Sequence, residues 1–452
     1  MATRNTPEGA SSAPADFTEN AEEGGLVGLA CLILVGGALT GLVTAAFRML
    51  LARAEHLREV LIADAHGHSI VGFVAVVGAT SVLAFLAAFM VRHYSPHATG
   101  SGIPHVEAVL HGTIKPAGAS LVLVKFVGGL SAIGSGLVLG REGPSVQMGA
   151  IISLVVGRVF RRSWADCRVL LAAGAGAGLA TAFNAPIAGA VFVLEELVQR
   201  FEHRIAIAAL GAAASAIAVA RLLLGNQLDF QVAAYPEPGM TTWPLFMALG
   251  GVAGVAAVGY NRSILGALAL ADSARYLPAE VRAALIGALI GTVAWFAPGL
   301  VGGGDNITQS ILSGGAVLTL MPAVFILRFV LGSVSYAAGT PGGLFAPLLV
   351  LGTQIGFMFG ALCGPVFHAS VPPEAFAVVG MAAFFAGVVR APLTGIILVG
   401  EMTGSSSLLV PTVFASFTAM MAASLLRDRP IYESLHDRTV QLEERLRRPA
   451  KA

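Results

Sequence analysis

Long apolar stretches recur along this chain from Leu26 to Leu426. A helix that crosses the hydrocarbon core of a bilayer needs about 20 mostly apolar residues. The mean hydropathy of +0.80, with only 12% charged residues, suits many such crossings. Backbone groups in lipid must bond internally, which restricts spanning segments to helices and closed barrels. We therefore predict an all-α polytopic membrane protein.

Charge and cysteine content exclude several other classes. The formal net charge of +1 gives no reason to expect nucleic acid as a partner. The three cysteines (Cys31, Cys167 and Cys363) lie far apart without a CxxC pattern. Neither a zinc site nor a disulfide framework is implied, and we predict no metal and no cofactor. The sequence also lacks the HExxH and GxSG patterns of intramembrane or soluble hydrolases, so it does not predict an enzyme.

Residues 140–144 form an ionisable segment, Gly-Arg-Glu-Gly-Pro, within apolar sequence. A carboxylate inside a membrane is costly, so Glu142 is by default a functional residue. The flanking glycines allow backbone N–H groups to approach an anion, and Pro144 suits the first turn of a helix. We expect Glu142 at a helix N-terminus where an anion would also bind. The alternative is a structural ion pair with Arg141.

Three groups of landmarks occur twice in the chain, at nearly constant separation. Glycines and a leucine from Gly100 recur with an offset of 202, the Gly140 segment with an offset of 203, and the Ala185-Pro186 segment with an offset of 206. We infer two membrane repeats. The predicted divisions are a polar tail (1–24), a first repeat (25–225), a loop (226–242), a second repeat (243–426) and a C-terminal segment (427–452).

Internal repeats interrupted by Gly and Pro at matching positions indicate a binding site between the repeats, near the middle of the bilayer. Helices that stop there point their positive N-terminal ends inward, which favours a small anion. Repetition alone leaves open whether the repeats are parallel or inverted.

The segments 100–104, 140–144 and 343–347, read with Phe183–Gly189 and with Tyr432 after Arg429-Pro430, resemble the signatures of the CLC family of chloride channels and transporters. The resemblance covers about residues 25–438. It implies an inverted repeat with many tilted and discontinuous helices, assembled as a homodimer with one pathway per subunit. It also implies a secondary-active transporter that exchanges chloride for protons. The alternative is a passive chloride channel of the same fold, gated by Glu142.

The same resemblance assigns roles to individual residues. Chloride would be bound by the hydroxyl groups of Ser101 and Tyr432 and by the backbone N–H groups of Leu344 and Phe345. Glu142 would be the gating and proton-accepting glutamate, and Glu196 the inner proton relay. The supporting residues of the first two segments are Gly100, Gly102, Ile103, Pro104, Gly140, Arg141, Gly143 and Pro144.

Other ionisable residues receive structural interpretations. Glu195 recurs as Glu401 and is expected to be a scaffold acceptor, whereas the position after Glu401 is Met402, which leaves Glu196 unrepeated. Lys125 and Glu107 are expected to pair.

His105 and His111 flank Glu107 without a strong metal spacing, so ordinary polar contacts are expected for them. An arginine-rich tail favours cytoplasmic termini. The resemblance implies the plasma membrane of a prokaryote.

Overall fold

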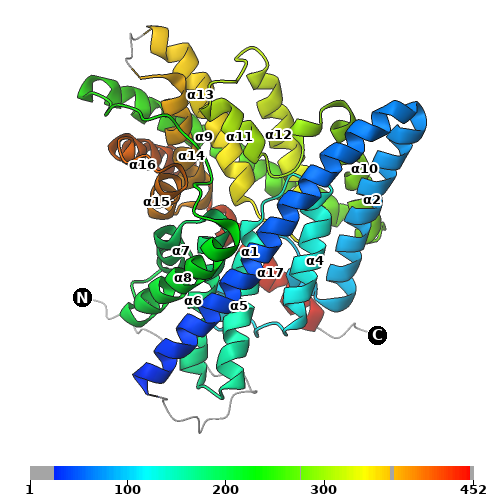
Figure 1. Cartoon of the computed structure of the whole chain (residues 1–452), viewed down its shortest axis with the longest axis vertical. Helices are drawn as coiled ribbons and strands as arrows, with labels where there is room; N and C mark the ends of the chain where they lie inside the picture. The colour runs from blue at the N-terminus through cyan, green and yellow to red at the C-terminus, as the bar shows by residue number, and fades with distance from the viewer. Residues whose placement is uncertain (1–24, 275, 367–370, 448–452) are drawn as a thin grey trace.

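The computed structural model describes residues 25–274, 276–366 and 371–447 (Figure 1). The predicted polar tail (1–24) and the last five residues (448–452) of the predicted C-terminal segment lie outside the described residues. Within the described part, the chain is helical and strand pairing is limited to two isolated bridges. The helices before residue 225 are α1 (Leu26–Ala65), α2 (Ser69–Tyr94), α3 (Ile103–Leu110), α4 (Ser120–Gly134), α5 (Glu142–Val159), α6 (Trp164–Phe183), α7 (Pro186–Phe192) and α8 (His203–Leu224).

A second set of eight helices follows, and then a final helix. These are α9 (Trp243–Ser273), α10 (Ala279–Phe296), α11 (Asp305–Leu312), α12 (Met321–Tyr336), α13 (Phe345–Val366), α14 (Pro373–Val389), α15 (Pro392–Thr403), α16 (Leu409–Leu425) and α17 (Ile431–Arg447). Short 3-10 turns cover His66–His68, Pro96–Ala98, Met240–Thr242 and Pro298–Leu300, and a π-helical turn covers Val193–Leu197.

Helix packing repeats between the two sets. The α5–α6 contact has its counterpart in α13–α14, and the α1–α8 contact has its counterpart in α9–α16. The two equivalent helices α2 and α10 pack on each other. Short helices α3 and α11 each begin after a left-handed glycine, Gly102 (φ 81°) and Gly304 (φ 94°). Such φ values suit glycine, which has no Cβ to clash with the backbone.

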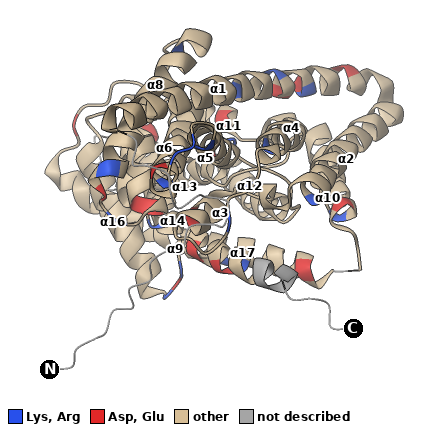
Figure 2. Cartoon of the chain, turned by 90° about the horizontal axis from the view of Figure 1, so that it is seen from below, with Lys and Arg blue, Asp and Glu red and all other residues tan. Residues whose placement is uncertain are grey.

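Six helical stretches of the described residues are long and apolar enough to cross a membrane. The protein is therefore a multi-pass membrane protein, and several of its other apolar helices are shorter than a full crossing. Helices α6 and α14 are almost entirely buried and form the centre of the core. Acidic and basic residues gather on α17 and on the later part of α1 (Figure 2).

Each repeat caps a short helix of the other. Glu195 accepts hydrogen bonds from the N–H groups of Leu393 and Thr394 in the first turn of α15, at 3.0 and 2.7 Å. Glu401 accepts two from the first turn of α7, at 3.2 and 2.8 Å. A carboxylate is favourable at this end of a helix. The prediction that Glu195 is a scaffold acceptor is confirmed.

A buried cation stabilises the matching loop of each repeat. Lys125 Nζ donates to the carbonyl groups of Gly100 and Ser101, at 2.7 and 3.2 Å. Arg328, at the equivalent position, donates to three carbonyl groups in the loop before α11. The expected Lys125–Glu107 pair is wrong, because Lys125 bonds backbone oxygens while Glu107 contacts other side chains described below.

Candidate anion and proton site

The repeats meet through their backbones at equivalent positions. Gly140 N–H donates to the Gly343 carbonyl at 2.8 Å, and Gly343 N–H donates to the Gly140 carbonyl at 2.7 Å. The bridge is antiparallel, as a two-fold relation between the repeats requires. A second bridge joins Gly100 to the segment 340–342. These contacts bring the first turns of α5 and α13 together.

Glu142 is the first residue of α5 and is fully buried. Its Oε1 accepts a hydrogen bond of 2.6 Å from the N–H group of Phe345, the first residue of α13. A Cβ atom added to Gly140 or to Gly343 would collide with this carboxylate. The carboxylate thus lies at the converging N-termini of two helices, where positive dipole ends and free N–H groups favour negative charge.

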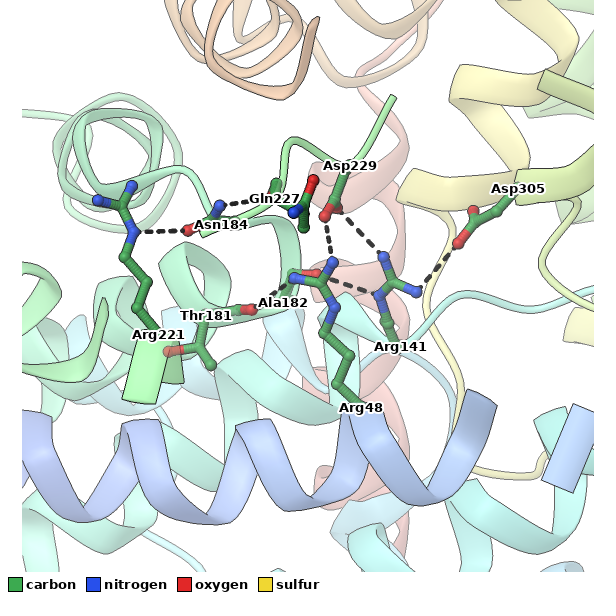
Figure 3. Close-up of polar contacts among 9 residues, drawn as sticks. All are labelled: Arg48, Arg141, Thr181, Ala182, Asn184, Arg221, Gln227, Asp229 and Asp305. Atoms are coloured by element: carbon green, nitrogen blue, oxygen red, sulfur yellow. Dashed lines mark hydrogen bonds and ion pairs between the residues drawn. The ribbon is translucent and has the colours of Figure 1, made fainter. Parts of the chain in front are cut away.

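Arg141 belongs to a network of charged residues (Figure 3). Its guanidinium donates to Asp305, the first residue of α11, at 3.0 Å, and to Asp229 of the inter-repeat loop at 3.2 Å. Arg48 of α1 pairs with the same Asp229. The alternative of an Arg141–Glu142 pair is therefore not the observed arrangement. The network instead ties both repeats and the loop between them to the segment that carries Glu142.

Two buried hydroxyl groups lie beside the glutamate. Ser101 and Tyr432 are fully buried, and neither hydroxyl oxygen has a hydrogen-bond partner among the described residues. The Tyr432 ring lies 6.1 Å from the ring of Phe345, centroid to centroid. Leu344, also buried, immediately precedes α13. We call Ser101, Glu142, Leu344, Phe345 and Tyr432 the central site.

The supporting residues of the first two segments lie next to the central site. Gly100 adopts a left-handed conformation (φ 58°), and its carbonyl accepts from Lys125. Ile103 and Pro104 form the first turn of α3 and are buried. Gly143 packs against the Ser101 backbone so closely that a Cβ atom at position 143 would collide with it. Close backbone approach explains the glycine at 143.

Glu196 lies on the π-helical turn that continues α7, and it is 7% exposed. Such turns often mark functional positions in helices. Glu195, its neighbour, is committed to α15, so the two carboxylates have separate surroundings. Helix α3, which carries Glu107, contacts this turn.

Sequence reasoning missed the partner of Glu107. Glu107 Oε2 lies 3.6 Å from Nδ1 of His436 on α17, and Glu107 Oε1 accepts from Gln199 Nε2 at 3.3 Å. Nothing local signals a pair separated so far along the chain. We call Glu107, Glu196, Gln199 and His436 the inner cluster.

The flanking histidines have no metal partners among the described residues, where no group of three potential ligands occurs. His105 Nδ1 lies 3.2 Å from Gln147 Nε2, an ordinary polar contact of the expected kind.

Several helices end within the protein, the two repeats are joined through their backbones, and a carboxylate lies between helix N-termini. These features are typical of membrane proteins that pass small ions. The sequence profile described as voltage gated chloride channel matches residues 83–424. The chain belongs to the CLC family of chloride channels and transporters.

Curated relatives agree with this assignment. The H(+)/Cl(-) exchange transporter ClcA of Vibrio cholerae is 37% identical over 420 residues, which cover 91% of this chain and 89% of the relative. ClcA of Vibrio vulnificus is 36% identical over 415 residues, with 90% and 88% covered.

Solved structures show the same fold. A slow cyanobacterial Cl-/H+ antiporter superposes with a TM-score of 0.87 at 29% identity, over 91% of this chain and 98% of that one. A CLC-type fluoride/proton antiporter has a TM-score of 0.77 at 22% identity, over 90% and 97% of the two chains, and supports the fold alone. The predicted all-α inverted repeat is confirmed.

Proposed function

We propose that this protein exchanges chloride for protons across the membrane, with Glu142 as the gate and the proton acceptor. One observation carries the proposal: the Glu142 carboxylate accepts the Phe345 N–H at the N-terminus of α13, where a small anion would bind. When ionised, the carboxylate competes with the anion. When protonated, it loses the charge that holds it there and gives up the position. One side chain then couples both fluxes.

Chloride is the anion that best suits the neighbouring donors. The hydroxyl groups of Ser101 and Tyr432 are buried and free to donate, and buried polar groups without a partner call for a ligand. Together with the N–H groups of Leu344 and Phe345 they form a neutral set of donors. Neutral donors hold an anion weakly enough to release it, which conduction requires. We assign Ser101, Tyr432, Leu344 and Phe345 as the chloride ligands.

Protons need a second acid, because Glu142 is fully buried, whereas α17 after Tyr432 carries exposed residues at one face of the protein. Glu196 is buried and carries no capping duty, so we assign it as the inner relay between that face and Glu142. A passive channel gated by Glu142 is the competing function. It requires no inner acid, so Glu196 favours exchange.

The predicted homodimer with one pathway per subunit, the cytoplasmic termini and the location in a prokaryotic plasma membrane belong to the same proposal. Basic residues of the C-terminal segment, including Arg427 and Arg429, support a cytoplasmic α17.

The decisive experiment records chloride and proton fluxes together in liposomes under an imposed chloride gradient. The wild-type protein is expected to pump protons uphill. Glu142→Gln mimics the protonated gate, so chloride should still move while coupled proton flux falls by about two orders of magnitude or more. Glu196→Gln should likewise lose proton movement and keep chloride movement.

The matched control is Glu195→Gln, because Glu195 is adjacent in sequence but bonds α15. Its coupling should resemble that of the wild type. Uphill proton pumping that persists in Glu142→Gln or Glu196→Gln contradicts the exchange mechanism. A wild-type reversal potential that ignores pH would instead identify a channel.

A further inference from the structure

The inner cluster contains one histidine that no part of the exchange mechanism above uses. His436 lies on α17, and its side chain is 16% exposed, whereas the Glu107 side chain on α3 is 6% exposed. Nδ1 and Oε2 are 3.6 Å apart, within the range of a charge pair. Gln199 holds the other Glu107 oxygen at 3.3 Å. The pair therefore joins a partly exposed imidazole to a buried carboxylate in a fixed orientation.

The charged groups around His436 all favour its protonated form. The Glu107 carboxylate raises the pKa of His436 above its ordinary value against the opposing effect of burial, and Asp437 and Glu433 on α17 act in the same direction. The ring of His111, after α3, is 6.4 Å away, centroid to centroid. Histidine ordinarily titrates near pH 6.5, and these charges raise the pKa of His436 from that value.

Helix α3, which carries Glu107, contacts the turn that carries Glu196, so the negative charges of these two carboxylates repel each other. A protonated His436 offsets the Glu107 charge, and Glu196 can then remain ionised. When His436 is neutral, the uncompensated Glu107 charge favours a proton on Glu196. A proton on His436 therefore disfavours a proton on Glu196, and the reverse, because both residues interact with the Glu107 charge.

We propose that His436 takes up protons at the α17 face and supplies them to Glu196, with Glu107 as the charge that couples the two residues. In the step, the bond from Nδ1 or Nε2 of the imidazolium to its proton breaks, and the proton passes through water to a Glu196 oxygen. Before the step the imidazolium and two carboxylates sum to one negative charge. Afterwards neutral His436, ionised Glu107 and protonated Glu196 sum to the same charge. The proton thus moves inward without changing the charge of the cluster.

This inference rests on the proposed exchange function and is tested on the full chain in liposomes. Chloride-driven proton flux is recorded at symmetric pH between about 5.5 and 8.5, which makes the orientation of the protein irrelevant. His436→Gln should reduce proton flux about tenfold above neutral pH. It should also remove the inflection that titration of the histidine produces in the plot of proton flux against pH. Glu107→Gln keeps the histidine but removes its ion partner, so the inflection should move to lower pH.

Two controls separate proton supply from a structural role. His111→Gln changes a neighbouring imidazole that has no ion pair with Glu107, and its pH profile should match that of the wild type. In the Glu142→Gln background, where chloride moves alone, adding His436→Gln should leave chloride flux unchanged. A reduction there would show that the residue shapes the protein and would overturn the inference.

The inference also fails when the wild type exchanges chloride for protons but His436→Gln and Glu107→Gln retain its rate and pH profile. That outcome differs from failure of the proposed function, in which the wild type itself pumps no protons.

Discussion

At the scale of single residues, Gly140 fixes where the Glu142 carboxylate can lie. The three atoms nearest to an added Cβ at this position all belong to the Glu142 carboxyl group. Sequence could identify Glu142 because a carboxylate in apolar surroundings is rare. Sequence could not supply the pairing of Glu107 with His436, because contacts between distant helices depend on packing that no local pattern encodes. Charge alone led to the prediction that Lys125 pairs with Glu107, although Lys125 donates to backbone carbonyl groups.

Gly140→Ala should therefore push the carboxylate away from the N-terminus of α13. Displacing a side chain from its preferred rotamer costs about 1 kcal/mol, so we expect the number of protons moved per chloride to fall by up to about tenfold. Paired flux measurements in liposomes would show this. In the Glu142→Ala background, where proton coupling is already lost, the same substitution should leave the chloride flux almost unchanged, since the colliding group is absent. A fall in that chloride flux would show that alanine at position 140 disturbs the backbone as well, and would contradict the steric explanation.

At the scale of helices, the two reciprocal caps are the clearest product of the repetition. Offsets in sequence predicted that Glu195 and Glu401 have equivalent roles, but they could not show that each carboxylate caps a helix of the opposite repeat. Helix ends were also hard to place from sequence, because Gly and Pro interrupt segments that remain apolar. The π-helical turn at Val193–Leu197 has no sequence signature of its own.

Glu195→Ala and Glu401→Ala should each lower stability by about 1 kcal/mol, because each removes the acceptor for two N–H groups at a helix N-terminus. Thermal unfolding of the purified variants in one detergent would measure the losses. We expect a somewhat larger loss for Glu195→Ala, because Glu195 Oε2 also accepts the Thr394 hydroxyl at 2.7 Å. A larger loss for Glu401→Ala would contradict this order.

At the scale of the whole molecule, charged residues join parts that are distant in the chain. Asp229, with its side chain 2% exposed, serves both Arg48 and Arg141, and so connects the inter-repeat loop to the first repeat. The predicted fold and repeat organisation follow from hydropathy and from Gly and Pro landmarks. The charged network cannot be predicted from these features, because Asp229 lies in a polar loop whose course is set only by the assembled helices.

Asp229→Asn should destabilise the protein by about 3 kcal/mol, because it leaves two partly buried guanidinium groups without their shared counter-ion. Asp305→Asn is the matched control. The Asp305 side chain is 44% exposed, so water can replace its contact with Arg141, and the loss should stay below about 1 kcal/mol. Denaturation midpoints of both variants under identical conditions test the difference. Equal midpoints would show that burial does not decide the strength of these pairs.

The reciprocal bonds between Gly140 and Gly343 also limit how this protein can work. Sliding or tilting one half of the molecule against the other would break both bonds at once, together with the two exchanged caps. Rotating the Glu142 carboxylate away from α13 breaks a single hydrogen bond, the one from the Phe345 N–H group. The least costly movement is therefore that of one side chain within a nearly rigid body, and the proposed exchange cycle needs no large movement of domains, unlike the cycles of many carriers.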